Sequence, residues 1–328
     1  MTNTMKAMVA TGYGSPEVLQ LQEVTKPEPN ANELLVKVMT ASATTADTML
    51  RTGTPYFSRL FIGLTKPKKP IPGTGFSGIV EKVGAEVSQY KAGDRVFGET
   101  GFDFSSNAEY LTISEKAIVL PMPENMDFSE AASFGDGHLT SFNFLKEIAN
   151  LKAGQKVLIN GAAGALGTSA VQIAKFMGAH VTAVCSGRNV GLVKSLGADE
   201  VIDYQQKDFT KTDETYDFVY DTVGKSSYKA CKSILKTNGE YLSPVLQGPL
   251  LLAMMTTSLS SGKKARFEAT GANKEEKLRG LLTEVLDIYK AGRLQTVIDR
   301  QFPLEKLAEA HRYIDSGHKK GNVVIVNY

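Results

Sequence analysis

Cysteine and histidine are scarce in this chain of 328 residues. The two cysteines, Cys185 and Cys231, are too few for a disulfide framework and suit a reducing compartment. A structural zinc site of four cysteines is thereby excluded, and none of the four histidines stands in a metal-ligand spacing such as HExxH. The sequence therefore predicts no metal site.

Long apolar runs and a large net charge are also missing. No run approaches the roughly 18 apolar residues that cross a bilayer, and residues 1–10 lack the regions of a secretory signal. The net charge of +2 predicts no basic stripe for nucleic acid, and the KPKKP run at 66–70 is interpreted as a solvated loop rather than an anion-binding patch. These absences favour a cytoplasmic protein without a membrane or nucleic-acid partner.

The pattern of strands and helices divides the chain in two, as its length leads us to expect. Residues 1–125 hold short valine-rich runs between turn signals, such as 34–42, which predict a β-barrel-type unit. Farther along, predicted strands at 156–160 and 180–184 alternate with helices, the first of them at 165–178. This alternation predicts an α/β unit with a doubly wound parallel sheet and helices on both faces.

A glycine-rich loop joins the first of these strands to the first helix. The sequence KVLINGAAGALG places Gly161, Gly164 and Gly167 in a GxxGxxG spacing, with Ala163 at the middle position of the usual GxGxxG. A helix that starts at such a loop points free N–H groups and a positive dipole at a bound phosphate. The strand before the loop and the helix after it favour nucleotide binding over a tight turn without a ligand.

The end of the second strand lacks an acid. An NAD site usually carries an Asp or Glu here, roughly 20 residues past the glycines, to bind the ribose hydroxyls. This chain instead has Ser186, Arg188 and Asn189, and its next acid is Asp199. These side chains donate hydrogen bonds and suit a 2′-phosphate, so the sequence predicts NADPH over NADH. The alternative is that Arg188 is only a surface charge.

Several segments together resemble the medium-chain dehydrogenase/reductase superfamily, and more narrowly its zinc-free quinone oxidoreductase branch. They are KAMVATGYGSPEVLQLQEV, GAAGALGTSAVQIAKFMGA, SLGADEVIDY, YDTVG and KKGNVVIVNY, which extend over nearly the whole chain. The resemblance implies a GroES-like catalytic domain made of residues 1–125 with 268–328 returning to it. It implies a Rossmann domain at 126–267 and, commonly, a homodimer.

The resemblance also bears on zinc. Zinc-dependent relatives carry a catalytic Cys near the position of the ATTADT segment and a Gly-His-Glu after the PG turn. This chain has Thr44 to Asp47 at the first place and PGTGFSG at the second, without His or Glu. A zinc-independent member of the family is therefore expected. The family's frequent Asn at the Thr44 position and aromatic residue at the Met49 position are also absent, a departure that concerns the nicotinamide-side and substrate contacts.

The resemblance assigns coenzyme contacts position by position. Thr140 would lie near the nicotinamide, the glycine loop at the pyrophosphate, and Tyr204 at the adenosine phosphate. Further contacts come from the ends of later strands and from the C-terminal segment. The full predicted set is Thr140, Gly161, Ala163, Gly164, Ala165, Leu166, Gly167, Ser186, Arg188, Asn189, Tyr204, Thr222, Val223, Pro244, Val245, Leu246, Lys320, Gly321 and Asn322.

Without a metal, the acceptor has to be reactive by itself. A quinone or an α,β-unsaturated carbonyl meets this condition, and the enolate formed after hydride transfer is protonated by water or a tyrosine. Tyr56 and Thr44 are the candidate catalytic residues, and Asp47 is interpreted as structural or water-holding. The MMTTSLSSGKK segment at 254–264 has no regular pattern and is expected to be a substrate-side or interface loop. The alternatives are an enoyl-thioester reductase and a non-catalytic NADPH-binding protein.

Overall fold

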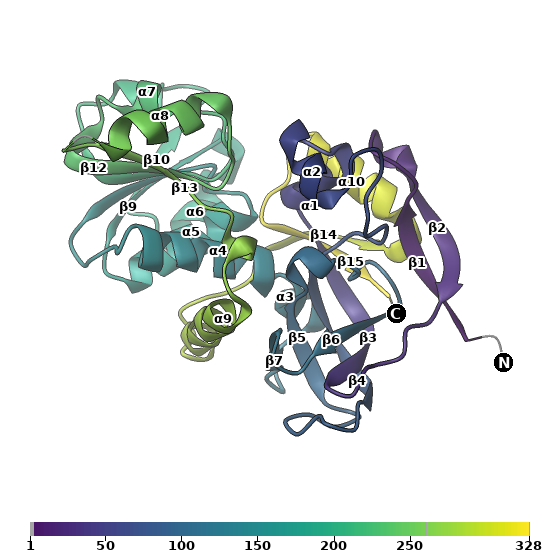
Figure 1. Cartoon of the computed structure of the whole chain (residues 1–328). Helices are drawn as coiled ribbons and strands as arrows, with labels where there is room; N and C mark the ends of the chain where they lie inside the picture. The colour runs from purple at the N-terminus through teal and green to yellow at the C-terminus, as the bar shows by residue number, and fades with distance from the viewer. Residues whose placement is uncertain (1–2, 260, 328) are drawn as a thin grey trace. The chain divides into compact units, whose positions relative to one another are not determined.

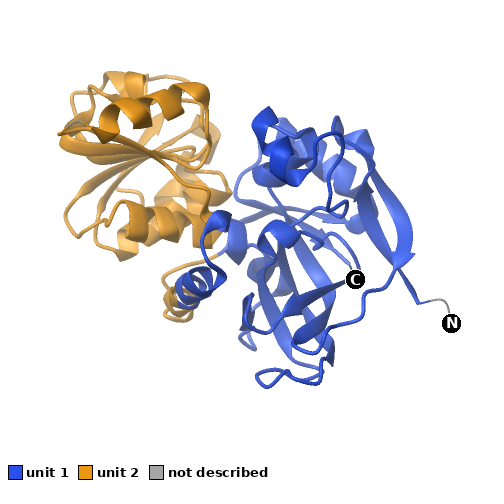
Figure 2. Ribbon diagram, viewed as in Figure 1, with its two compact units in different colours: residues 1–136, 271–283, 296–328 blue, residues 137–270, 284–295 orange. Residues whose placement is uncertain are grey.

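The computed structural model describes residues 3–259 and 261–327, which form two compact units (Figure 1, Figure 2). Unit 1 holds the described residues up to 136 together with 271–283 and those from 296 onward. Unit 2 holds those of 137–270 and 284–295. Helix α9 (Glu275–Lys290) contributes residues to both units.

Unit 1 is built around a mainly antiparallel sheet in which β3 (Glu33–Ala43) pairs with β4, β6 and β15. Alternate residues of β3, including Leu34, Val36 and Val38, point into the hydrophobic core, as the period of a half-buried strand requires. The strands are β1 (Thr4–Ala10), β2 (Leu19–Thr25), β3, β4 (Gly75–Val83), β5 (Arg95–Glu99), β6 (Tyr110–Ser114), β7 (Ile118–Pro121), β14 (Ile298–Pro303) and β15 (Asn322–Val326). The α-helices are α1 (Thr45–Thr52), α2 (Arg59–Ile62), α3 (Phe128–Ala132) and α10 (Leu307–Asp315).

Unit 2 is a six-stranded parallel sheet in the order β10-β9-β8-β11-β12-β13. Helices α5 and α6 lie on one face, and α7 and α8 on the other (Figure 1). The strands are β8 (Lys156–Asn160), β9 (His180–Cys185), β10 (Glu200–Asp203), β11 (Tyr216–Asp221), β12 (Leu235–Ser243) and β13 (Lys264–Phe267). The helices are α4 (Thr140–Phe142), α5 (Ala165–Phe176), α6 (Val190–Ser195), α7 (Tyr228–Cys231) and α8 (Gly248–Ser258). The predicted fold class, an antiparallel β-rich unit with a doubly wound α/β unit, is confirmed.

One expected loop is a helix. The residues from 254 to 258, predicted to be irregular, form the end of α8, which begins at Gly248 with a proline in its first turn. The segment shows no helical period because α8 has no distinct polar face, and Leu251, Leu252 and Met255 are exposed. Among the described helices, none has the length and apolar character needed to span a bilayer.

Candidate functional site

The glycine loop after β8 is shaped by close contacts that a side chain would block. Gly161 has a φ of +78°, and its N–H and that of Ala162 both donate to Val184 O, at 3.1 and 3.0 Å. A Cβ on Gly161 would lie 2.6 Å from a methyl group of Val223 and 2.7 Å from Thr222 Oγ1. Only glycine fits both the conformation and the space at this turn.

The loop leads into α5 in the way that phosphate-binding loops do. A Cβ on Gly167 would lie 2.2 Å from Gly161 O, so the first turn of α5 packs directly on the loop. Gly164 caps α5 without any side-chain hydrogen bond, and the nearest atom to a Cβ there is 3.5 Å away. The N–H groups of this turn are thus left for an outside acceptor, which fits a pyrophosphate.

A buried carboxylate organises the neighbouring strand end. Asp221, fully buried at the end of β11, accepts hydrogen bonds from Asn160 Nδ2 (2.9 Å) and Tyr241 Oη (2.7 Å). It also accepts from the backbone N–H groups of Gly224 (3.0 Å) and Ser226 (2.9 Å). These bonds fix the turn that carries the predicted contacts Thr222 and Val223. Sequence analysis missed Asp221; its signal is an acid that directly follows the apolar run 218–220.

The predicted 2′-phosphate residues share one turn at the end of β9. Asn189 Nδ2 donates to Ser186 Oγ at 3.2 Å, Ser186 is 7% exposed, and Arg188 is exposed. Asp199, the next acid in sequence, lies elsewhere and pairs with Lys175 at 2.8 Å. A second acid was missed, because Asp203 on β10 brings Oδ2 to within 2.7 Å of where a Cβ on Gly187 would be.

The remaining predicted contacts of unit 2 lie at the same edge of the sheet. Tyr204 follows β10, donates its N–H to Cys185 O at 3.1 Å, and is 57% exposed. Ser141, next to Thr140, donates to Leu166 O at 2.8 Å, which ties α4 to the start of α5. Gln247, just beyond Pro244 to Leu246, donates from Nε2 to Gly224 O at 2.5 Å. The structure thus gathers the predicted residues of unit 2 around the carboxyl ends of the strands, where open α/β sheets bind ligands.

In unit 1 the structure brings Thr44 close to the C-terminal strand. The antiparallel pairing of β3 with β15 aligns Ala43 with Val323, so Thr44 lies beside Asn322. Asn322 Nδ2 donates to Val297 O at 3.1 Å. Gly321 has a φ of +64°, and a Cβ there would lie 2.3 Å from Val297 O. Lys320 donates its N–H to Asp299 Oδ2 at 3.0 Å.

Thr44 also forms a closed pair with Asp47 at the start of α1. Asp47 Oδ2 accepts from Thr44 N (2.8 Å) and lies 2.9 Å from Thr44 Oγ1, which in turn accepts from Asp47 N (3.1 Å). This is a capping box, through which Asp47 fixes the start of α1. Asp47 is only 1% exposed, and Oδ1 has no hydrogen-bond partner among the described residues.

Three carboxyl groups of unit 1 influence one another's protonation. Burial raises the pKa of Asp47 to about 7, against the hydrogen bonds from Thr44, and the carboxyl of Asp136 raises it further. Burial likewise raises the pKa of Glu99 to about 8. It also raises the pKa of Asp136, although the positive charge of Lys319 acts in the opposite sense. Glu99 Oε2 is enclosed against Gly135, where a Cβ would lie 1.8 Å from it. Asp47 and Glu99 are therefore substantially protonated near neutral pH.

Tyr56, the other candidate catalytic residue, lies in a different environment. It is 73% exposed, and the Arg59 guanidinium lies 4.9 Å from its ring centroid. The structure therefore does not bring Tyr56 into the buried group formed by Thr44 and Asp47.

The titratable side chains suited to zinc are scattered. No group of three or more His, Cys, Asp or Glu residues among those described is placed to hold a metal ion. Cys185 and Cys231 are buried, and burial raises the pKa of each thiol to about 11. His138 Nδ1 lies 2.7 Å from Ser169 Oγ, and burial lowers the pKa of His138 to about 3. The donor set of a zinc site does not fit these residues.

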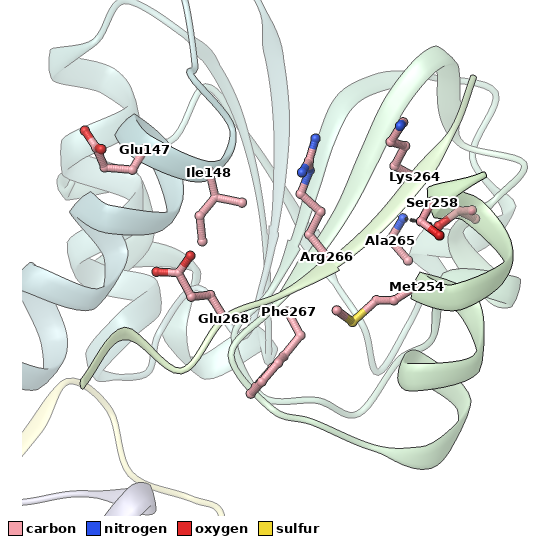
Figure 3. Close-up of a pocket in the computed structure, with 10 residues that line it drawn as sticks. Glu147, Ile148, Met254, Ser258, Lys264, Ala265, Arg266, Phe267 and Glu268 are labelled. Atoms are coloured by element: carbon pink, nitrogen blue, oxygen red, sulfur yellow. Dashed lines mark hydrogen bonds between the residues drawn. The ribbon is translucent and has the colours of Figure 1, made fainter. Parts of the chain in front are cut away.

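A separate hollow of about 430 Å³ lies at the edge of the unit 2 sheet. Figure 3 shows it between Glu147 and Ile148 on one side and Met254 of α8 on the other, with Arg266 of β13 beside it. Arg266 is engaged by Glu240, with Nε 2.6 Å from Oε2. None of the predicted coenzyme contacts or candidate catalytic residues lines this hollow, so it is not the candidate nucleotide site. Its lining does include Met254, Thr257, Ser258 and Lys264 of the segment that was expected to be a substrate-side or interface loop.

Comparison with known proteins agrees with this architecture. Residues 30–124 match the family model of the alcohol dehydrogenase GroES-like domain, and residues 196–325 match that of zinc-binding dehydrogenases. The chain is 33% identical to a chloroplastic quinone-oxidoreductase, QR1, of Triphysaria versicolor, over 98% of each chain. It is 30% identical to a chloroplastic NADPH-dependent alkenal/one oxidoreductase of Arabidopsis thaliana, over 98% of this chain and 79% of that one. The quinone oxidoreductase of Coxiella burnetii has a similar structure, with 30% identity, a TM-score of 0.88, and coverage of 99% of this chain and 100% of that one.

The two glycines of the loop should respond differently to alanine. Gly167→Ala forces a methyl group against Gly161 O and should lower the free energy of unfolding by about 2–3 kcal/mol. Gly164→Ala has room for its methyl group and should cost about 1 kcal/mol or less. Urea unfolding of both variants measures the difference. Equal losses would contradict the close packing of α5 on the loop.

Proposed function

Because the chain belongs to the medium-chain dehydrogenase/reductase superfamily, we propose that it is a zinc-independent, NADPH-dependent reductase of quinones or α,β-unsaturated carbonyls. The observation that carries this proposal is the loop from Gly161 to Gly167, which leaves the first turn of α5 uncapped beside a turn of hydrogen-bond donors. The names of the two curated relatives, a quinone oxidoreductase and an NADPH-dependent alkenal/one oxidoreductase, support it.

The coenzyme would be held mainly by the strand ends of unit 2. We assign the pyrophosphate to the loop from Ala163 to Leu166, and the 2′-phosphate to Ser186, Arg188 and Asn189. In unit 1, Lys320 to Asn322 would contact the nicotinamide side, as the family resemblance implies. When bound, the reduced coenzyme supplies the hydride, and this chain supplies position and electrostatics.

The class of substrate that accepts the hydride is inferred from the side chains available to its carbonyl oxygen. Reduction of a simple ketone or oxidation of an alcohol calls for a Lewis acid or a strong base at the oxygen. The described part of unit 1 presents the Thr44 hydroxyl and the Asp47 carboxyl, which burial keeps partly protonated, as hydrogen-bond and proton donors. A quinone or enone needs only such donors, because its ring or β-carbon is already electrophilic.

Of the two candidate catalytic residues, Thr44 and Tyr56, we favour Thr44 as the proton donor. Its hydroxyl donates to Asp47 Oδ2 at 2.9 Å, and burial holds Asp47 partly protonated. When the proton of Asp47 is on Oδ2, this bond would reverse, so that Thr44 Oγ1 passes its own proton to the reduced substrate and takes one from Asp47. Tyr56 is 73% exposed, so its proton would be exchanged with solvent instead.

The proposed reaction is tested by the loss of NADPH absorbance with a soluble quinone, an enone and a crotonyl thioester. We expect turnover with the quinone or the enone that a metal chelator leaves unchanged. Turnover with the thioester alone would favour an enoyl-thioester reductase. Binding of NADPH without turnover of any acceptor would favour a non-catalytic binding protein, and loss of activity with the chelator would refute the zinc-independent mechanism.

The coenzyme preference is tested at Arg188. Arg188→Ala removes a charge-assisted bond to the 2′-phosphate and should weaken NADPH binding by about tenfold or more, with NADH nearly unchanged. Asp203→Asn is a control whose effect on NADPH binding should have the opposite sign. It removes a carboxylate next to Gly187, so NADPH should bind more tightly. Dissociation constants from fluorescence titration measure both effects. An equal weakening of NADPH and NADH by Arg188→Ala would show that the pocket is wrongly assigned.

The proton donor is tested by the pH profile of kcat/KM. A neutral Asp47 donates through Thr44, so activity should fall as the pH rises above about 7, where the carboxyl loses its proton. Asp47→Asn should lower kcat by about 10²-fold and remove this limb. Asp136→Asn removes a neighbouring negative charge, which makes Asp47 more acidic and moves the limb to lower pH. An alkaline limb that persists in Asp47→Asn would point to another donor, such as Tyr56.

A further inference from the structure

Unit 1 exposes an unusual concentration of large apolar side chains around α2. Five of them fall within nine consecutive residues that form the short 3₁₀ helix Tyr56–Ser58, α2 and the start of the next loop. We call them the α2 face: Tyr56 (73% exposed), Phe57 (54%), Leu60 (66%), Phe61 (75%) and Leu64 (68%). Single exposed apolar residues are ordinary, but a contiguous group of this kind marks an interaction surface.

The α2 face is held in place rather than left as a loose loop. The Arg59 guanidinium donates to Gly53 O (3.0 Å) and Thr52 O (2.9 Å) and lies 4.4 Å from the ring centroid of Tyr13. Tyr13 Oη donates to Gly63 O at 2.6 Å. Arg59, the polar residue of α2, is thus bonded to the rest of the unit, whereas Leu60 and Phe61 of α2 are exposed.

Basic residues border the α2 face. From residue 48 to residue 80 the sequence contains no Asp or Glu. Lys66, Lys68 and Lys69 are exposed, and of these Lys69 pairs with Asp103 at 3.1 Å. The backbone turns back at Gly63, where a Cβ would lie 2.0 Å from Lys66 O, and this turn returns the lysines to the apolar residues.

The apolar and basic residues together line a shallow hollow of about 400 Å³. Its lining includes Leu60, Leu64, Lys66 and Lys68. Hydrocarbon and cationic groups are therefore presented side by side. This pairing matches an anionic phospholipid, whose phosphate lies directly above its acyl chains.

We propose that the α2 face and its lysines dock this protein on the surface of a membrane that contains anionic phospholipid. Phe and Tyr side chains would enter the boundary between headgroups and acyl chains, and Lys66 and Lys68 would contact the phosphates. This replaces two expectations from the sequence, namely that KPKKP is only a solvated loop and that the protein has no membrane partner. The contact is peripheral and needs no spanning helix.

A second copy of the chain fits the same surface less well. A symmetric contact through the α2 face would bring Lys66 and Lys68 close to the same residues of the other copy, and like charges repel. An acidic partner surface would attract these lysines instead of repelling them. A layer of anionic lipid presents such a negative surface to the whole α2 face.

The proposal is tested by sedimenting the full chain, without coenzyme, with vesicles of phosphatidylcholine alone or with added phosphatidylglycerol. We expect binding to the anionic vesicles that weakens as salt is added. Phe57→Ser/Phe61→Ser should lower the partition coefficient at least tenfold. Lys66→Gln/Lys68→Gln should lower it about fivefold per lysine and remove most of the salt dependence.

Phe176→Ser is the matched control, because Phe176 is a 51% exposed aromatic residue on α5 of unit 2. Its binding should equal that of the parent, and circular dichroism confirms that each variant is folded. Failure of the parent to bind, or equal binding by the Phe57/Phe61 variant, would overturn the proposal. A change of oligomeric state in that variant, seen by light scattering without vesicles, would assign the α2 face to self-association instead. Since no coenzyme is present, these outcomes are independent of the proposed reaction.

Discussion

The candidate nucleotide site depends on one buried carboxylate. Asp221 ends β11 in the middle of the unit 2 sheet, and its oxygens accept hydrogen bonds from β8, from β12 and from the turn that follows. A carboxyl group buried in this way is tolerated because its oxygens accept hydrogen bonds from several donors. The same bonds place the ends of three neighbouring strands in one register. The glycine loop, which contacts Thr222 and Val223 directly, can take its shape only when that register is kept.

The buried carboxyl groups of unit 1 differ from Asp221 because they accept fewer hydrogen bonds. Asp47 has one oxygen bonded to Thr44 and one without a partner among the described residues, and Glu99 likewise has an unpartnered oxygen. Burial without enough donors favours the neutral form, so these groups keep protons at pH values where an exposed carboxyl has lost them. The difference between Asp221 and Asp47 is therefore one of hydrogen-bond supply. It separates a carboxylate that organises structure from one that is chemically suited to donate a proton.

The fold could be predicted from the sequence because its signals are local and repeated. The strands at 156–160 and 180–184 and the helix after the glycine loop were found nearly to the residue, since period and glycine spacing fix them. Helix α8 was missed because it has no polar face to give a period.

Long-range contacts could not be predicted from the sequence in the same way. Asp203 comes to Gly187 from the next strand, 16 residues later in the sequence, and only the pairing of β9 with β10 brings them together. Asp221 was overlooked for the same reason, because its partners come from β8 and β12. The exposure of Tyr56 could not be predicted either. It is found on a segment held by the bonds of Arg59 to Gly53 O and Thr52 O, and these bonds leave no pattern in the sequence.

The two proposals meet in the chemistry of the acceptor. Quinones and enones that carry long apolar groups concentrate in bilayers, because burial of hydrocarbon in the membrane is favourable. An enzyme that meets such substrates only in water encounters a small fraction of them, whereas one docked on the membrane meets them where they accumulate. The α2 face lies in the same unit as Thr44, and α1, which Thr44 caps, precedes α2 by only a few residues. A chain that binds lipid through α2 would therefore bring its proposed proton donor close to the source of an apolar substrate, although neither property requires the other.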